Sequence, residues 1–176
     1  MNNLDEFITL NNINKDQLMD ALHYDIRELL LKTICERLKS DKELYLKIRK
    51  LYFTHDDLVA TKKVVLFICK CQLSNEDFLW MNDCLKAFIN KKDTRKAIPG
   101  ELKKQLCDKQ DNKCAICGRS LESVNSHVDH IIPWDYVGDE LKNNYQVLCS
   151  DCNLHKSNHV AITVSNIILN KQGGLL

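Results

Sequence analysis

The fold of this chain is decided by the stretch CAICGRSLESVNSHVDHIIPWDYVGDELKNNYQVLCSDCNLHKS (residues 114–157). It begins with the pair Cys114 and Cys117, and the pair Cys149 and Cys152 lies near its end. A Cys-x-x-Cys turn directs two thiolates at one point, and two such turns supply the four ligands of a tetrahedral structural Zn²⁺. We therefore predict a zinc site made by these four cysteines.

The two cysteine pairs are far apart for a simple zinc ribbon. Thirty-one residues lie between Cys117 and Cys149, whereas an ordinary ribbon has about 15–20. The intervening segment must therefore form more than a plain hairpin. A redox-active Cys-x-x-Cys is the alternative, but that motif occurs singly in a βαβ-like context, and neither pair has such a context.

A second candidate site combines Asp129 and His130 with Asn153, the residue directly after Cys152. A carboxylate oxygen and an amide oxygen are hard ligands suited to Mg²⁺, and an imidazole beside them can take up a proton near neutral pH. A divalent ion next to a general base suits the hydrolysis of a phosphodiester by water. The sequence thus indicates two unlike sites within one segment.

The order and spacing of these residues resemble the HNH endonucleases of the zinc-bearing ββα-metal type. The anchors that carry the resemblance are the first cysteine pair, Asp129-His130-Ile131-Ile132-Pro133, NYQVLC (residues 144–149) and Cys152-Asn153-x-x-Lys156. The resemblance covers about residues 95–157, a third of the chain.

The resemblance implies a role for each matching residue. Asp129 and Asn153 would be ligands of a catalytic Mg²⁺ or Mn²⁺, and His130 would be the general base. Asn144 would brace the loop between two strands so that His130 is correctly aimed. Asn153 stands where the family's name has a histidine, a common variant, and Ser157 replaces the usual glycine after the last lysine.

Local patterns predict a strand over residues 127–132, a long loop, a strand over 145–148 and a helix from Cys152. Asp129 and His130 are adjacent and would face opposite ways in a regular strand, so the resemblance implies that the chain departs from regular strand geometry there. His127 shares the parity of Asp129. We take His127 and Lys156 as candidate auxiliary metal or phosphate contacts.

The N-terminal half contains no glycine and no proline before Pro99. All five glycines lie at position 100 or later, and the two prolines are Pro99 and Pro133, so residues 1–98 contain no strong breaker and are predicted to be helical. Four helix starts are predicted from a capping residue followed three positions later by an acid or amide: Asn14 with Gln17, Ser40 with Glu43, Thr54 with Asp57, and Ser74 with Asp77.

Apolar residues behind Asn14 recur at three-and-four spacing and predict one buried stripe. They are Leu18, Leu22, Ile26, Leu29, Leu30, Ile34 and Leu38. We expect an antiparallel helical bundle over residues 1–94, a polar boundary at NKKDTRK (residues 90–96), and a nuclease domain over residues 95–176. Pro99 can open a helix that runs to about Lys109, and residues 160–170 fit either helix or strand. The predicted fold class is α+β.

Composition limits the remaining function classes. No apolar run approaches the roughly 18 residues of a membrane span, and no signal peptide is visible at the start, so we expect a cytoplasmic protein with no membrane partner. The chain has 25 basic and 24 acidic residues, which gives DNA binding little help from counterion release. We therefore expect the helical bundle to be an assembly module that recruits a protein partner or a second copy.

Two functions remain open at this stage. The favoured one is a metal-dependent endonuclease that cuts DNA, of the kind delivered by a larger partner such as an ATPase in bacterial restriction or anti-phage complexes; that placement is analogy. The alternative is a zinc-stabilised nucleic-acid or protein binding module that has lost catalysis. Asp129, His130 and Asn153 pointing apart on the surface would favour the alternative.

Overall fold

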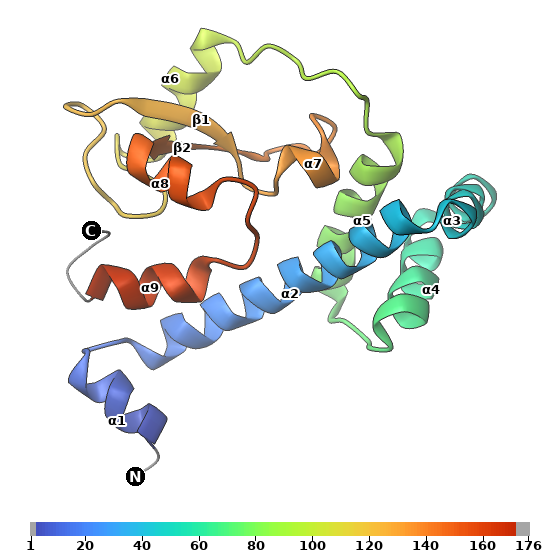
Figure 1. Ribbon diagram of the computed structural model, residues 1–176, viewed down its shortest axis with the longest axis horizontal. Helices are drawn as coiled ribbons and strands as arrows, with labels where there is room; N and C mark the ends of the chain where they lie inside the picture. Colours follow the sequence, from blue (N-terminus) through green and yellow to red (C-terminus); the bar gives the residue numbers. More distant parts are fainter. Residues whose placement is uncertain (1–2, 172–176) are drawn as a thin grey trace. The chain divides into compact units, whose positions relative to one another are not determined.

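The structure is a computed structural model that describes residues 3–171 (Figure 1). The last five residues of the predicted nuclease domain lie outside this range. The helices are α1 (Asn3–Leu10), α2 (Lys15–Ser40), α3 (Lys42–Thr54), α4 (Asp57–Cys69), α5 (Asn75–Asn90), α6 (Gly100–Lys109), α7 (Trp134–Val137), α8 (Ser150–Lys156) and α9 (Thr163–Lys171). The strands β1 (Ser126–His130) and β2 (Tyr145–Cys149) pair antiparallel, so the predicted α+β class is confirmed.

The described chain divides into two compact units, and both are discontinuous in sequence. One comprises the chain up to Ile26, Ala97–Ile131 and Tyr145 onward, and the other comprises Arg27–Lys96 with Ile132–Asn144. We call them the hairpin unit and the helical unit. From the sequence we predicted two domains that fold independently, with the boundary between residues 94 and 95. That boundary stays a prediction.

The helical unit is built from the second half of α2 together with α3, α4, α5 and the short α7. Neighbouring helices α3, α4 and α5 pack in sequence order, and α7 packs on α5. The inner faces supply fully buried side chains, among them Ile34 and Leu38 of α2, Val64 of α4, and Met81 and Leu85 of α5. Short connections between helices favour this packing of sequential neighbours.

Two of the four predicted helix starts are confirmed. Asn14 accepts a hydrogen bond from the Gln17 amide at 2.9 Å, and Ser74 accepts one from the Asp77 amide at 3.1 Å. The other two predictions were wrong, because Asp41 caps α3 and Asp56 caps α4. Helices α2 and α3 each run on through the residue predicted to cap the next helix, so the aspartates that follow become the caps.

The predicted buried stripe of α2 was wrong in its first half. Leu22, Ile26 and Leu29 are 42%, 49% and 48% exposed. The face that is buried instead carries Ala21, Asp25, Glu28, Leu31, Ile34, Cys35 and Leu38. Two acidic residues on this face mislead a pattern based on hydrophobicity alone, because a buried carboxylate that has hydrogen-bond partners can take a core position.

The hairpin unit contains the β1–β2 hairpin, with α6 and α8 packed on β2 and α8 also packed on β1. Its small core consists of Cys114, Leu121, Val147, Leu148, Cys149 and Cys152. The segment over 160–170, open between helix and strand from sequence, forms α9 from Thr163. Asp25 of α2 caps α9, since its two carboxylate oxygens accept from the Thr163 and Val164 amides, both at 2.9 Å. None of the described helices is long and apolar enough to cross a membrane.

Candidate metal centre and active site

The four cysteines predicted as zinc ligands come together from two places in the hairpin unit. Cys114 and Cys117 lie in the turn after α6, where Gly118 has a φ of +70° and donates its N–H to the Cys114 carbonyl at 2.9 Å. That left-handed backbone favours glycine. Cys149 ends β2, and Cys152 lies in the first turn of α8. One turn and one strand-to-helix junction therefore present all four thiols.

The geometry of this cluster fits a tetrahedral zinc ion. All four sulfur atoms lie within 4.8 Å of one another, and the Sγ atoms of Cys117 and Cys149 are 3.9 Å apart. Zinc–sulfur bonds of about 2.3 Å in a tetrahedron require sulfur separations of about 3.8 Å. The donor set and its spacing thus support structural zinc binding.

Backbone N–H groups favour the thiolate form of Cys114, whereas burial raises the pKa of Cys117 and of Cys152. Burial raises the pKa of Cys114, but backbone N–H groups of residues 117, 149 and 116 outweigh burial and bring the pKa to about 7. The Cys149 amide, for example, lies 3.4 Å from the Cys114 sulfur. A thiol whose pKa is lowered in this way ionises easily, and the thiolate is the form that binds metal.

The Gln110 side chain fixes the cysteine turn to the hairpin. Its Oε1 accepts from the Val147 amide at 2.8 Å, and its Nε2 donates to the Val147 carbonyl at 3.0 Å. The same Nε2 donates to the Lys113 carbonyl at 2.9 Å. The amide thus pairs with β2 as a neighbouring strand would, directly before the first zinc-binding turn.

Asp129 and His130 are the last two residues of β1. In the antiparallel register Asp129 lies opposite Gln146, and His130 lies opposite Tyr145. Gln146 Nε2 donates to Asp129 Oδ2 at 3.3 Å, and the His130 and Tyr145 rings have centroids 4.6 Å apart. Cross-strand neighbours therefore orient both side chains.

Lys156 at the end of α8 contacts both of these residues. Its Nζ lies 2.8 Å from Asp129 Oδ2 and donates to the His130 carbonyl at 2.7 Å. The lysine side chain is only 5% exposed. Asn153 lies one turn earlier on the same helix and is half-buried, so residues three apart on α8 share the face directed at the end of β1. Asp129, one of the two predicted oxygen ligands, contacts this lysine.

Asn144 closes the loop between the two strands. Its Oδ1 accepts from the Ile132 amide at 2.7 Å, and its Nδ2 donates to the Ile132 carbonyl at 2.8 Å. The asparagine is 3% exposed. Because Ile132 is two residues after His130, these bonds fix the chain where it leaves β1.

Residues 114–159 match the family model of the HNH endonucleases. The chain carries an HNH endonuclease domain. No curated protein and no solved structure was found to match the chain.

The HNH domain differs in one respect from the sequence expectation. Regular pairing with β2 continues through His130, so the departure from strand geometry that the resemblance implied does not occur within the Asp129–His130 pair. It comes after His130, where Ile132 pairs with Asn144 and the one-turn helix α7 follows. Adjacent strand residues face opposite sides, so Asp129 faces α8 while His130 packs beside Tyr145.

The auxiliary candidates behave differently in the HNH domain. Lys156 joins the site directly, whereas His127 is exposed at the start of β1, with its Nε2 3.1 Å from Ser150 Oγ. Gln146 and Gln110 were missed from sequence. Their contacts depend on the register of β1 on β2 and on the position of α6, and the long loop between the strands leaves that register open until the chain is folded.

Proposed function

We propose that this protein is a metal-dependent endonuclease that hydrolyses phosphodiester bonds of DNA. The HNH family match supports the reaction class. The single observation that carries the proposal is that the buried Lys156 side chain contacts the Asp129 carboxylate and the backbone carbonyl of His130 at once. It brings the carboxylate of β1 to the helix face that carries Asn153.

Two kinds of metal fit the donor atoms present. Cys114, Cys117, Cys149 and Cys152 would hold structural Zn²⁺, and the Asp129 carboxylate with the Asn153 amide would hold Mg²⁺ or Mn²⁺. Both hydrogen bonds to Asp129 described above use Oδ2, and we assign Oδ1 to the divalent ion. When bound, that ion would polarise the phosphate and stabilise the leaving oxygen.

Residues of the chain supply the general base and hold the catalytic side chains in position. His130 takes the proton of the attacking water through its imidazole. Gln146 and Lys156 orient Asp129, and Lys156 also holds the His130 carbonyl. Asn144 fixes Ile132 and with it the exit of β1, so that the imidazole keeps one direction. We assign to the exposed His127, near Ser150, a contact with a neighbouring phosphate.

The biological setting is a separate proposal. We infer that residues 1–94 form an assembly module that brings the HNH domain of residues 95–176 to its target. Residues 95–176 contain 10 basic and 9 acidic side chains, which provides little general attraction for DNA. By analogy we propose a protein partner such as an ATPase, in a bacterial restriction or anti-phage complex in the cytoplasm.

Cleavage of plasmid DNA by the His130→Ala variant tests the nuclease proposal. With Mg²⁺ present, the rate should fall about 10²–10⁴-fold, because the general base is lost, while zinc content stays unchanged. His23→Ala, which alters an exposed histidine of α2, is the matched control and should cut like the wild type. Equal rates for wild type and His130→Ala would overturn the proposal. Wild-type protein that binds DNA but never cuts it would favour the binding module.

A further inference from the structure

Positive charge is concentrated in one part of the helical unit. Residues 42–70 contain seven basic side chains and three acidic ones, a balance of +4, whereas the whole chain has +1. The basic residues are Lys42, Lys47, Arg49, Lys50, Lys62, Lys63 and Lys70, and all are exposed. The segment is the α3–α4 helical hairpin, so this charge lies on two neighbouring helices.

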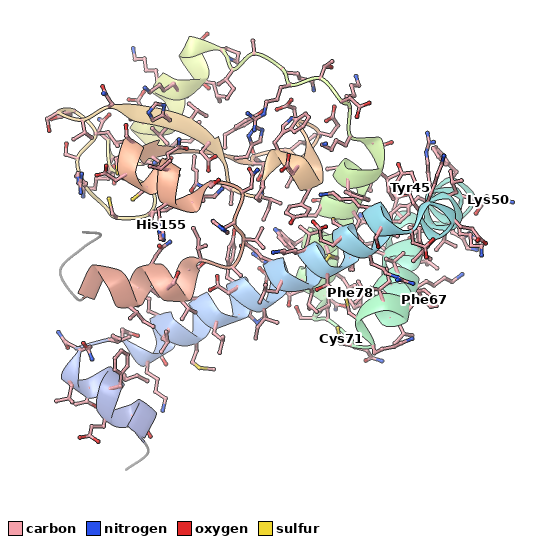
Figure 2. All side chains as sticks on the ribbon, viewed as in Figure 1. Tyr45, Lys50, Phe67, Cys71, Phe78 and His155 are labelled. Atoms are coloured by element: carbon pink, nitrogen blue, oxygen red, sulfur yellow. The ribbon has the colours of Figure 1, made fainter. Side chains whose placement is uncertain are left out.

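The outward side of α3 combines cations with apolar residues and has no acid. At 100° per residue, five exposed residues fall within an arc of about 100°: Lys42, Leu46, Arg49, Lys50 and Phe53. We call them the α3 face. The one acid of α3, Glu43, lies beside this arc and is paired with Lys47 at 2.6 Å. Lys50 is marked on α3 in Figure 2.

Helix α4 repeats the same arrangement. Its exposed side carries Val59, Lys62, Lys63, Leu66 and Phe67, and its buried side carries Ala60, Thr61, Val64 and Val65. The two helices meet through their inner residues, where the Tyr52 hydroxyl lies 2.7 Å from Thr61 Oγ1. The outward sides of both helices are exposed, and Lys62 of α4 lies 5.6 Å from the ring centroid of Phe78 on α5.

The exposed aromatic rings lie beside cations. Phe53 is 71% exposed with the Arg49 guanidinium 5.7 Å from its ring centroid, and Phe67 is 59% exposed with Lys70 Nζ at 5.1 Å. Cations that follow a phosphate backbone, next to rings on which bases or sugars can pack, are typical of nucleic-acid surfaces. Rings this exposed bury only a minor part of their surface against their own chain.

We propose that the α3–α4 hairpin is a nucleic-acid binding surface that contacts the phosphate backbone of the DNA substrate. An acidic protein is the other occupant that the charge allows. Six of the seven cations are lysines, and lysine is depleted at protein interfaces but is a common phosphate contact. The identity of the DNA as substrate rests on the proposed nuclease function. The α3–α4 hairpin supplies the positive charge that residues 95–176 lack.

Charge reversal on the full-length protein tests the surface. The variant Arg49→Glu/Lys50→Glu is compared with Lys15→Glu/Lys32→Glu, which makes the same charge change at two exposed positions of α2. Fluorescence anisotropy with a labelled 30-base-pair duplex and its single strand, without added divalent metal, gives the affinity at several salt concentrations. Zinc content and circular dichroism establish that each variant is folded.

We expect the α3 variant to bind both DNA probes about tenfold or more weakly at 100 mM salt, with a salt slope smaller by about two because two phosphate contacts are lost. The α2 variant should bind like the wild type. The uncharged variant Arg49→Gln/Lys50→Gln should lie between. Equal affinity of the α3 and α2 variants would overturn the proposal. So would unchanged DNA binding combined with loss of a co-purifying acidic protein.

This experiment distinguishes a failure of the surface proposal from a failure of the nuclease proposal. If the wild type cleaves plasmid and the α3 variant keeps wild-type affinity, the surface proposal fails while the nuclease stands. If the wild type never cleaves DNA but the α3 variant loses affinity, the nuclease proposal fails while the surface stands.

Discussion

Lys156 and Asp129 form an ion pair in which the ammonium nitrogen lies 2.8 Å from Oδ2, with the two side chains 5% and 21% exposed. The same nitrogen is hydrogen-bonded to the His130 carbonyl. The last residue of α8 therefore ties that helix to the end of β1. The carboxylate that we assign to the divalent ion is already oriented by a fixed cation.

Replacing Lys156 with methionine should lower the free energy of unfolding by about 3 kcal/mol, because removing one partner of a buried pair leaves the other charge uncompensated. Thermal or urea unfolding measures the loss. Lys104→Met, at an exposed position of α6, should change stability by less than about 0.5 kcal/mol. The double variant Asp129→Asn/Lys156→Met should recover part of the loss. A Lys156→Met protein as stable as the wild type would show that the pair does not stabilise the fold.

Asp129→Ala and Asn153→Ala should each weaken binding of Mg²⁺ or Mn²⁺ without removing the base. Part of the lost cleavage rate should then return at higher metal concentration. His130→Ala should show no such recovery, because metal cannot replace a missing base. Rates measured over a Mn²⁺ titration for the three variants check this. Identical metal dependence in all three would contradict the assigned roles.

Asn144→Ala should lower the cleavage rate less than His130→Ala and leave zinc content unchanged. The variant removes two hydrogen bonds to Ile132 and leaves a buried N–H and a buried carbonyl unpaired, at about 1–3 kcal/mol each. Urea unfolding and cleavage kinetics measure the two effects. Lys142→Ala, at an exposed position of the same loop, is the control. A loss equal to that of His130→Ala would mean that Asn144 acts in the chemistry itself.

The purified chain should contain one zinc ion per molecule, and Cys149→Ser should remove it with loss of the HNH fold. The core of the hairpin unit is small, and three of its six buried members are cysteines of the cluster, so its stability depends on the metal. Elemental analysis and circular dichroism are the measurements. Cys107→Ser, outside the cluster, should keep the zinc. Folded, active protein without zinc would contradict this reading.

Cys35 and Cys84 should resist alkylation in the folded protein. Burial raises the pKa of Cys35 to about 12 and raises that of Cys84 further, so about one Cys35 thiol in 10⁴ is ionised at pH 8. Keeping Cys35 neutral contributes stability below the ordinary thiol pKa, and that contribution is lost as the pH rises towards 12. Mass spectrometry after iodoacetamide treatment should find the part-exposed Cys71 labelled first. Rapid labelling of Cys35 in native protein would contradict its burial.

Short-range spacing predicted the parts of this protein that depend on local geometry. The two Cys-x-x-Cys pairs pointed to one cluster, and the cysteine sulfurs do gather there. The resemblance to HNH endonucleases, rather than spacing, implied that Asn144 braces the loop between the strands, and Asn144 makes two hydrogen bonds to Ile132 in that loop. In these cases the residues of the motif themselves determine the conformation of the turn or loop that contains them.

Features set by tertiary packing were not predictable in the same way. Leu22, Ile26 and Leu29 have the spacing of a buried stripe yet are exposed, because α2 packs through a face that contains Asp25 and Glu28. Helix α7 is too short to show a periodicity, and its position depends on packing against α5. The concentration of charge on residues 42–70 is also hidden when the charges of the whole N-terminal half are summed.

The discontinuity of both units has a consequence for the order of events during synthesis. The helical unit needs residues 132–144, where Tyr136 and Val137 are buried, and the hairpin unit needs Asp25 to cap a helix that begins at Thr163. Chains are made from the N-terminus, and a unit folds once all of it has emerged. During synthesis, the helical unit cannot be completed before residues 132–144 emerge from the ribosome. The hairpin unit cannot be completed before α9 emerges. The folded site therefore forms only after α9 has been translated, and a chain terminated before residue 132 carries neither unit complete.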